Sequence, residues 1–176
     1  MGAVKAITFL RHAARGKDAD ALSPEGRVQA EDVGRTLRTD FAMIFVSPAH
    51  RTAETVAWLL RGSGQKLPSH SVTPALATQA EDRWRAAART AGSSRVDAIR
   101  AVDPDLVTGE VERLGRGAEE LFDRVPDGGR ALAVGHSPLI EAAVFGLTGV
   151  VLEPLAECQG LTVTRNNEGK YEIGEP

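Results

Sequence analysis

The sequence has few of the residues that build disulfides, metal clusters or membrane spans. Cys158 is the only cysteine among 176 residues, which excludes an internal disulfide and a cysteine-rich metal site. The 4 histidines are scattered, and no set of His, Asp and Glu has metal-site spacing, so we expect no metal and no cofactor. No apolar run approaches the roughly 20 residues of a membrane span. Neither a P-loop nor a dinucleotide fingerprint is present.

Length and charge indicate one domain, residues 1–176, with an ordinary globular composition. The chain is long enough for a sizeable core, and 42% of its residues are hydrophobic and 26% charged. The formal net charge of -3 provides no general attraction to nucleic acid or to an anionic membrane, so we expect neither as a partner. Lys5 interrupts the short apolar N-terminal segment, and no signal peptide is therefore predicted. Together with the single cysteine, this predicts a cytoplasmic protein.

The most informative feature that the sequence does contain is Phe9-Leu10-Arg11-His12-Ala13. Residues 6–10 form an apolar run that predicts a buried strand, with Arg11 and His12 at its carboxyl end. In open α/β sheets, this end of the strands is where ligands bind. An arginine there can hold a phosphate with its planar fork, and a neutral histidine nitrogen can attack phosphorus. The alternative interpretation is two polar surface residues after a strand.

A second strand-like run, residues 43–46, leads directly into Ser47-Pro48-Ala49-His50-Arg51. Ser47 suits a helix N-cap and Pro48 suits the first helical position, which places Arg51 about one turn into the helix. A cation near the positive end of a helix dipole is mildly unfavourable for the helix, so Arg51 at this place favours an anion site. The alternative is a solvated helix arginine.

A third apolar run, residues 131–134, leads into Gly135-His136-Ser137-Pro138. Gly135 permits a close approach of the backbone, and Ser-Pro again predicts the start of a helix. His136 then stands at the strand's end with helix N–H groups beyond it, although a locally hydrogen-bonded residue is the alternative. Three strand ends with such residues are hard to ascribe to chance, and they predict one phosphate site.

The order of the elements predicts a mainly parallel sheet with helices on both faces. The strands are expected at residues 4–10, 41–46, 67–73 (an edge strand) and 131–134, followed by a hairpin of residues 160–164 and 171–173. The first helix begins at Ser23-Pro24 and is expected to turn Val28, Val33 and Leu37 to the core, with Gly34 allowing close packing. The other helices are expected at residues 48–61 with Gly62 as C-cap, 81–89, 98–99 (a short one), 107–125 and 138–146.

The set of motifs resembles the histidine phosphatase superfamily, also called the phosphoglycerate-mutase-like or RHG family. The matching motifs span most of the chain in the family's order: Leu10-Arg11-His12-Ala13, Leu22-Ser23-Pro24-Glu25-Gly26-Arg27-Val28-Gln29-Ala30, Ser47-Pro48-Ala49-His50-Arg51-Thr52-Ala53-Glu54-Thr55 and Gly135-His136-Ser137. Each motif is weak alone and the set is specific. Chain length and residues 132–141 look most like the short bacterial branch that includes phosphohistidine phosphatases. The implied fold is an α/β three-layer sandwich.

The resemblance implies a phosphatase that works in two steps. His12 attacks the phosphoryl group to form phosphohistidine, and water then hydrolyses this intermediate. Arg11, Arg51 and His136 hold the phosphoryl oxygens and stabilise the charge of the transition state. Phosphoryl transfer depends mainly on positioning and electrostatic stabilisation, which two arginines and a histidine can supply without a metal.

The sequence departs from the family pattern at two places. Ala13 stands where the family has glycine, and we expect its methyl group to narrow the pocket. Many members have a glutamate close after Pro-x-Leu, whereas the first carboxylates after Pro74-Ala75-Leu76 are Glu81 and Asp82. Glu81 is our choice of proton donor, and a solvated charge in the first turn of a helix is the alternative. Without a well-placed acid, substrates with good leaving groups, such as phosphohistidine and acyl phosphates, would be preferred.

The substrate and two competing functions remain open at the level of sequence. Arg15 and Ser137 are further candidates for substrate binding, while a plain loop residue and a simple N-cap are their alternatives. The expected partner is a phosphorylated small molecule or a phosphohistidine protein, and a short chain with an open pocket slightly favours the protein. A non-catalytic phosphate-binding module is the main alternative. A mutase is a lesser one, because the sequence offers little length for a lid.

Overall fold

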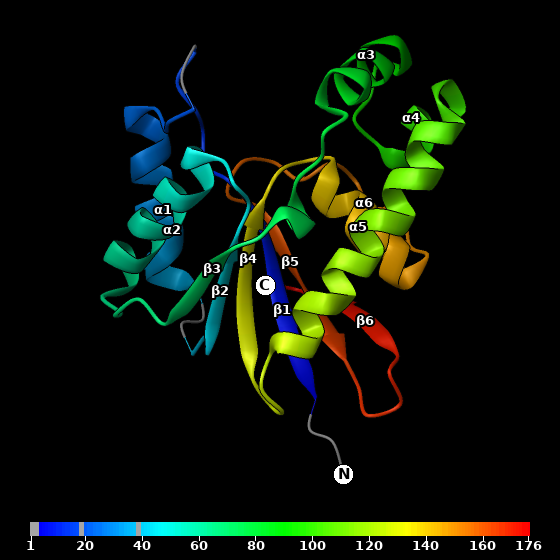
Figure 1. Ribbon diagram of the computed structural model, residues 1–176. Coiled ribbons are helices and arrows are strands. Elements are labelled where there is room, and N and C mark those ends of the chain that lie inside the picture. Colours follow the sequence, from blue (N-terminus) through cyan, green and yellow to red (C-terminus); the bar gives the residue numbers. More distant parts are fainter. Residues whose placement is uncertain (1–3, 18–19, 38–39) are drawn as a thin grey trace.

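A six-stranded sheet forms the centre of the protein in a computed structural model that describes residues 4–17, 20–37 and 40–176 (Figure 1). The strands are β1 (Lys5–Arg11), β2 (Met43–Val46), β3 (Ser69–Val72), β4 (Arg130–Gly135), β5 (Gly160–Arg165) and β6 (Tyr171–Gly174). Their order across the sheet is β3-β2-β4-β1-β5-β6. The first four in that order are parallel, and β5 and β6 add to β1 as an antiparallel hairpin. This confirms the expected mainly parallel sheet and the edge position of β3.

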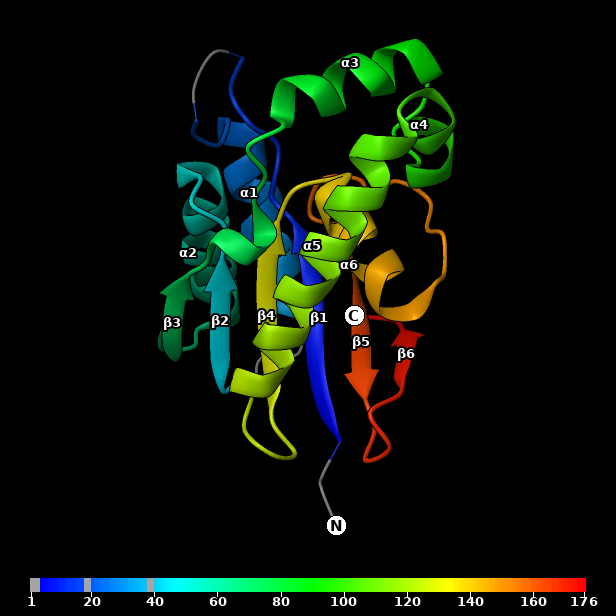
Figure 2. The same cartoon turned by 45° about the vertical axis from the view of Figure 1, so that its right-hand side comes forward.

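Helices cover both faces of the sheet and one of its ends. They are α1 (Pro24–Thr36), α2 (His50–Ser63), α3 (Glu81–Ala91), α4 (Val96–Val102), α5 (Pro104–Arg124) and α6 (Leu139–Thr148), with a short 3-10 turn, η1 (Pro74–Leu76). Figure 2 shows α5 and α6 on one face and α1 and α2 on the other. The α3 helix lies beyond the carboxyl ends of the parallel strands, next to the place where ligands bind in such sheets.

The central strands are buried on both faces because their side chains alternate between two apolar clusters. Phe9, Phe45 and Ala133 point to the larger cluster, under α5 and α6. Their neighbours Leu10 and Ile44 point to the smaller one, under α1 and α2. A continuous apolar run is what a parallel strand between two helical layers requires. This burial gives the strand ends a rigid base.

The α1 and α2 helices pack closely through glycine. A Cβ atom built on Gly34 would lie 2.1 Å from the carbonyl oxygen of Leu59, and one on Gly62 would lie 1.9 Å from that of Glu31. Gly34 therefore allows the close packing that the sequence predicts. The prediction that Gly62 ends α2 is wrong, because the helix continues to Ser63 and Gly64 follows it with a φ of 69°. Glycine readily adopts such a positive φ.

The structure corrects two further expectations about helices. Val28 is 59% exposed, so the predicted core face of α1 is wrong at this position; Gly26, Ala30 and Gly34 form its buried face instead. The small residues let the helix backbone approach its neighbours closely, which large side chains on that face would prevent. The α5 helix begins at Pro104, three residues before the predicted start, because the Asp103 carboxylate accepts a hydrogen bond from the amide of Leu106 at 3.1 Å.

Candidate active site

The candidate site lies where β1, β2 and β4 end side by side. The amide of His12 donates to the carbonyl of Gly135 at 3.0 Å, and the amide of Ser47 donates to that of Val134 at 3.1 Å. These contacts continue the sheet pairing just past the strand ends. They place His12, Ser47 and His136 around the mouth of a cavity of about 510 Å³. The other predicted site residues that line this cavity are Arg11, Arg15, Arg51, Glu81 and Ser137.

The hydrogen bonds of His12 determine which ring nitrogen can react. Nδ1 lies 2.7 Å from the carbonyl oxygen of Ala13, which can only accept, so Nδ1 carries the proton. Nε2 lies 3.3 Å from Nε of Arg51, which can only donate, so Nε2 presents its lone pair. Burial lowers the pKa of His12; the Ala13 carbonyl opposes this shift, and the charges of Arg51 and Arg11 add to it. The resting ring is neutral, with the unprotonated Nε2 on the side of Arg51.

His136 is held in the opposite tautomer. Its Nδ1 lies 3.1 Å from a terminal nitrogen of Arg51 and accepts from it, so the proton is on Nε2, which donates to Ser47 Oγ at 2.7 Å. Ser47 in turn donates to Thr52 Oγ1 at 3.2 Å, and Thr52 donates to the carbonyl of Ala49 at 2.6 Å. Burial lowers the pKa of His136 to about 3, and the charge of Arg51 contributes to that shift.

The role of Ser47 therefore differs from the predicted helix cap. The α2 helix begins at His50, and its N-cap position is Ala49, which makes no capping hydrogen bond through its side chain. Ser47 is 1% exposed and orients His136 instead. A serine-proline pair after a strand is the usual local pattern of a helix cap. The Ser47 hydroxyl instead bonds to His136, which follows β4 and lies 89 residues away in the sequence. Local sequence does not contain that information.

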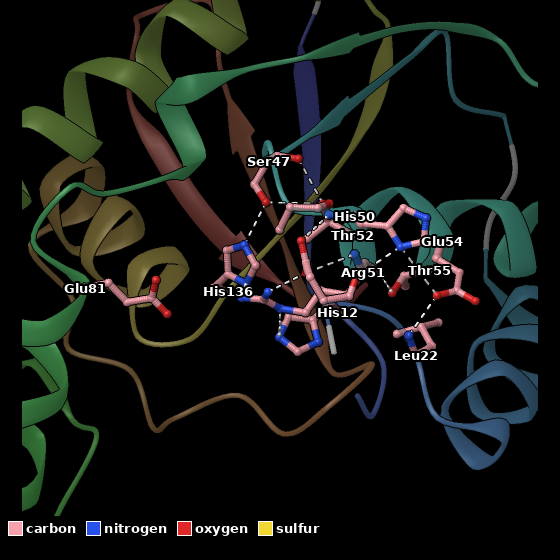
Figure 3. A network of polar contacts seen from close by, with 12 residues as sticks. His12, Leu22, Ser47, His50, Arg51, Thr52, Glu54, Thr55, Glu81 and His136 are labelled. Carbon is pink, nitrogen blue, oxygen red and sulfur yellow. Dashed lines mark hydrogen bonds and ion pairs between the residues drawn. The ribbon is translucent and has the colours of Figure 1, made fainter. Parts of the chain in front are cut away.

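Arg51 lies between the two histidines. Its Nε and one terminal nitrogen face His12 and His136 (Figure 3). Its other terminal nitrogen lies 2.6 Å from the Asp20 carboxylate. The two rings are close, with centroids 5.1 Å apart and planes at 61°. Arg51 thus reaches both rings at once, as its predicted role in holding a phosphoryl group requires. Asp20 was not among the predicted site residues.

The remaining polar residues of the α2 motif support this arrangement. Thr55 Oγ1 accepts from the amide of Ala13 at 3.1 Å and donates to the carbonyl of Arg51 at 2.7 Å. Glu54 accepts from the amide of Leu22 at 2.7 Å and from Arg27 at 2.8 Å. Side chains of α2 therefore hold both the segment after β1 and the start of α1 in place through hydrogen bonds. This accounts for the presence of several polar residues in the motif.

Ala13 lies in the core and does not narrow the cavity. Its side chain is completely buried in the smaller apolar cluster, and it is not part of the cavity wall. The expectation of a narrower pocket is therefore wrong. Ala13 acts through its backbone instead, since its carbonyl accepts from His12.

Arg11 is oriented by the segment before β5. A terminal nitrogen of Arg11 donates to the carbonyl of Leu155 at 2.6 Å, and the amide of Leu155 donates to Glu141 at 2.7 Å. The same Glu141 oxygen accepts from Ser137 Oγ at 2.5 Å. Burial raises the pKa of Glu141, although these hydrogen bonds oppose the shift. Ser137 therefore uses its hydroxyl within the protein, and α6 begins only at Leu139, so Ser137 is not its N-cap.

Glu81 and Asp82 differ in their relation to the cavity. Glu81 is part of the cavity wall, and Figure 3 shows its carboxylate extending from the first turn of α3 towards the two histidines. Asp82 does not line the cavity. Glu81 also pairs with Arg85 at 2.5 Å. Arg15 and Glu157 are exposed residues on the same wall, and Glu157 was not predicted, because a single acidic residue before Cys158 carries no recognisable signal.

Comparison with known proteins identifies the family of this chain. The family description "Histidine phosphatase superfamily (branch 1)" matches residues 8–166. The chain belongs to the histidine phosphatase superfamily. Among curated proteins, none matches the chain. Within the described ranges, no group of three or more His, Cys, Asp or Glu residues could hold a metal ion, and no helix has both the length and the hydrophobicity to cross a membrane.

Several solved structures share the fold of this member of the histidine phosphatase superfamily. A phosphoglycerate mutase from Bacillus anthracis str. Sterne has a TM-score of 0.76 at 19% identity, with 99% of this chain and 93% of that one covered. Phosphoserine phosphatase from Entamoeba histolytica, in complex with 3-phosphoglyceric acid, has a TM-score of 0.65 at 15% identity, covering 96% and 94%. A mycobacterial glucosyl-3-phosphoglycerate phosphatase has a TM-score of 0.63 at 16% identity, covering 97% of each chain. Since the mutase is covered almost completely, chain length does not separate phosphatases from mutases.

Proposed function

We propose that the protein is a phosphatase that hydrolyses a phosphoryl group through a phosphohistidine intermediate on His12. The observation that carries this proposal is the tautomer of His12. With Nδ1 donating to Ala13 at 2.7 Å, Nε2 keeps an unprotonated lone pair, which can attack a phosphorus atom between Arg51 and His136 once a phosphoryl oxygen replaces it as the acceptor of the Arg51 N–H. A neutral imidazole is required for such an attack, and burial keeps the pKa of His12 below its usual value.

In the first step, the Nε2 lone pair forms an N–P bond while the bond from phosphorus to the leaving oxygen or nitrogen breaks. The leaving atom takes the bonding electrons and accepts a proton. We assign the role of proton donor to Glu81. In the second step, water attacks phosphorus and gives a proton back to the Glu81 carboxylate. The N–P bond then breaks, its electron pair returns to Nε2, and inorganic phosphate is released.

Arg11, Arg51 and His136 hold the phosphoryl oxygens in both steps. The two N–H groups of Arg51 that face the histidines are directed at the place where the phosphoryl group must lie for attack. His136 is neutral in the resting site, but a phosphate dianion beside it raises its pKa and favours a proton on Nδ1. That proton can then be donated to a phosphoryl oxygen, with Nε2 still bonded to Ser47.

The substrate class is a small phosphate ester or a phosphohistidine side chain. A cavity of about 510 Å³ has room for more than the phosphoryl group, and small-molecule pockets commonly measure about 300–1,000 Å³. Arg15 and Glu81 lie on its exposed wall and can meet the leaving group. Two of the solved neighbours are described as a phosphoserine phosphatase and a glucosyl-3-phosphoglycerate phosphatase, and these names support a small ester as the first compound to test.

The test is a single-turnover experiment with two donors, an aryl phosphate and a phosphohistidine peptide. We expect the wild type to release phosphate from both and to form a phosphoenzyme that survives an alkaline quench. His12→Ala should do neither, while His70→Ala, which removes an exposed histidine on β3, should behave as wild type. Phosphate binding without turnover in the wild type would contradict the proposal and indicate a binding module.

The role of Glu81 has its own comparison. Glu81→Gln should slow the release of alkyl alcohols by about 100-fold or more, and should affect phosphohistidine far less, because that leaving group needs little protonation. Asp82→Asn is the matched control, since it removes a neighbouring charge that does not line the cavity. Equal losses in the two variants would argue against Glu81 as the proton donor.

A further inference from the structure

We propose that the Asp20 carboxylate competes with the phosphate dianion for Arg51 and so weakens ground-state binding of phosphate at this site. This inference rests on the proposed function. The segment after β1 carries several charges of both signs, and the sequence alone does not distinguish Asp20 from the others. Among the residues of this segment that the structure describes, Asp20 is the one whose carboxylate contacts Arg51.

The Asp20 carboxylate occupies an anion-binding position. One oxygen lies 2.6 Å from a terminal nitrogen of Arg51, and the other accepts from the amide of His50 at 2.8 Å. The amide of Arg51 also points to the carboxylate, at 3.4 Å. Arginine together with the first N–H groups of a helix is the arrangement by which proteins bind phosphate. Asp20 therefore acts as a resident anion beside the proposed phosphate position.

All three nitrogens of the Arg51 guanidinium are engaged in the resting site. Nε and one terminal nitrogen face the histidines, and the other terminal nitrogen faces Asp20. A phosphoryl group between the histidines can accept from Nε and from the terminal nitrogen that faces His136. The terminal nitrogen that faces Asp20 is available only if Asp20 shares or releases it. The negative charge of Asp20 also remains close to the incoming dianion, and like charges repel.

The Asp20 charge is a large part of the negative charge on the cavity wall. The arginines on its wall are Arg11, Arg15, Arg51 and Arg85, and the carboxylates are Asp20, Glu81 and Glu157. Asp20 is thus one of three carboxylates that face four arginines, and loss of its charge makes the wall more positive by one charge. Partial burial disfavours ionised Asp20, but the hydrogen bonds from His50 and Arg51 outweigh this effect and hold its pKa below the usual value. Asp20 is therefore charged whenever the enzyme meets phosphate.

Asp20 also caps α2 from outside the helix, which supplies a purely structural explanation for its contacts. Ala49, at the N-cap position, provides no side-chain hydrogen bond, whereas Asp20 accepts from the first helical amide. Two variants separate the two roles. Asp20→Asn keeps a good helix-capping oxygen and removes the charge, while Asp20→Ala removes both.

The experiment is calorimetric titration of inorganic phosphate into the wild type, Asp20→Asn, Asp20→Ala and Asp32→Asn. Asp32 lies on the exposed side of α1, so its variant makes the same change in net charge away from the cavity. We expect Asp20→Asn to bind phosphate about three- to tenfold more tightly, the range for one partly exposed charge contact with a dianion. The gain should shrink at high salt, and KM for an aryl phosphate should fall without a rise in kcat.

Each result has a clear meaning. Unchanged or weaker phosphate binding by Asp20→Asn overturns the inference, as does an equal gain in Asp32→Asn. A variant that melts as wild type yet binds phosphate more tightly supports it, because a pure cap would change stability and leave affinity alone. If neither the wild type nor Asp20→Asn binds phosphate and the wild type shows no turnover, both this inference and the proposed function fail. If it binds phosphate with an affinity that Asp20→Asn does not alter, only this inference fails.

Discussion

Acidification should destabilise the protein through His136. Its pKa lies at about 3 in the native state, mainly because of burial, against an ordinary value of 6.5. Between these two values, the unfolded chain binds a proton at this side chain and the native protein does not. Stability therefore rises with pH in this window and falls as the pH is lowered from about 6.5 towards 3.

The size of the effect follows from the same two values. From pH 7 to pH 5, the unfolded His136 becomes almost fully protonated while the native ring remains neutral, so the free energy of unfolding falls by about 2 kcal/mol. His12 contributes in the same direction because its pKa is also lowered. Urea denaturation at pH 7 and pH 5, with constant ionic strength, measures the loss.

Two variants assign the loss to its source. His136→Asn removes the titrating ring. Between pH 7 and pH 5, its free energy of unfolding should therefore fall by about 2 kcal/mol less than that of the wild type. His70→Asn removes an exposed ring and should keep the full dependence. A wild type that is equally stable at both pH values, or a His136→Asn variant with an unaltered pH dependence, would refute the reasoning.

Three further predictions concern the packing of α1, the role of Arg51 and the reactivity of Cys158. Gly34→Ala should destabilise the protein by about 1–3 kcal/mol in urea denaturation, since its Cβ would lie 2.1 Å from the Leu59 carbonyl, whereas Gly109→Ala in α5 meets nothing within 4 Å and should stabilise it. Arg51→Lys should lower kcat/KM for an aryl phosphate by about 100-fold or more, because an ammonium group cannot reach His12, His136 and Asp20 together. Burial raises the pKa of Cys158 to about 12, so iodoacetamide at pH 8 should label it only after denaturation.

The central residues of the site were predictable because their positions depend on sheet topology. Parallel strands end at one edge, so Arg11, His12 and His136 had to meet once residues 6–10 and 131–134 were recognised as strands. Arg51 was expected about one turn into the next helix, but α2 begins at His50, so Arg51 is its second residue. The comparison with known proteins tested the family and fold, whereas the roles of these residues still depend on the experiments above.

The supporting residues were not predictable, because their partners lie far away in the sequence. Ser47 has the local signature of a helix cap, yet its hydroxyl bonds to His136, 89 residues later. Asp20 reaches Arg51 across 31 residues from a polar loop with no regular period. The face of α1 was misjudged because hydrophobicity ranks Val28 above glycine, whereas close helix packing selects the smaller residues.

The same burial underlies both the proposed reactivity of the site and its expected weakness in acid. Arg51 can only donate, so it requires lone pairs on His12 and His136, and both rings are neutral at rest. Neutral His12 is a nucleophile, and neutral His136 can take up a proton as a phosphate dianion arrives. Protonation of either ring before phosphate binds would place another positive charge beside Arg51 and remove a hydrogen-bond acceptor. The site is therefore organised to gain its proton together with its substrate.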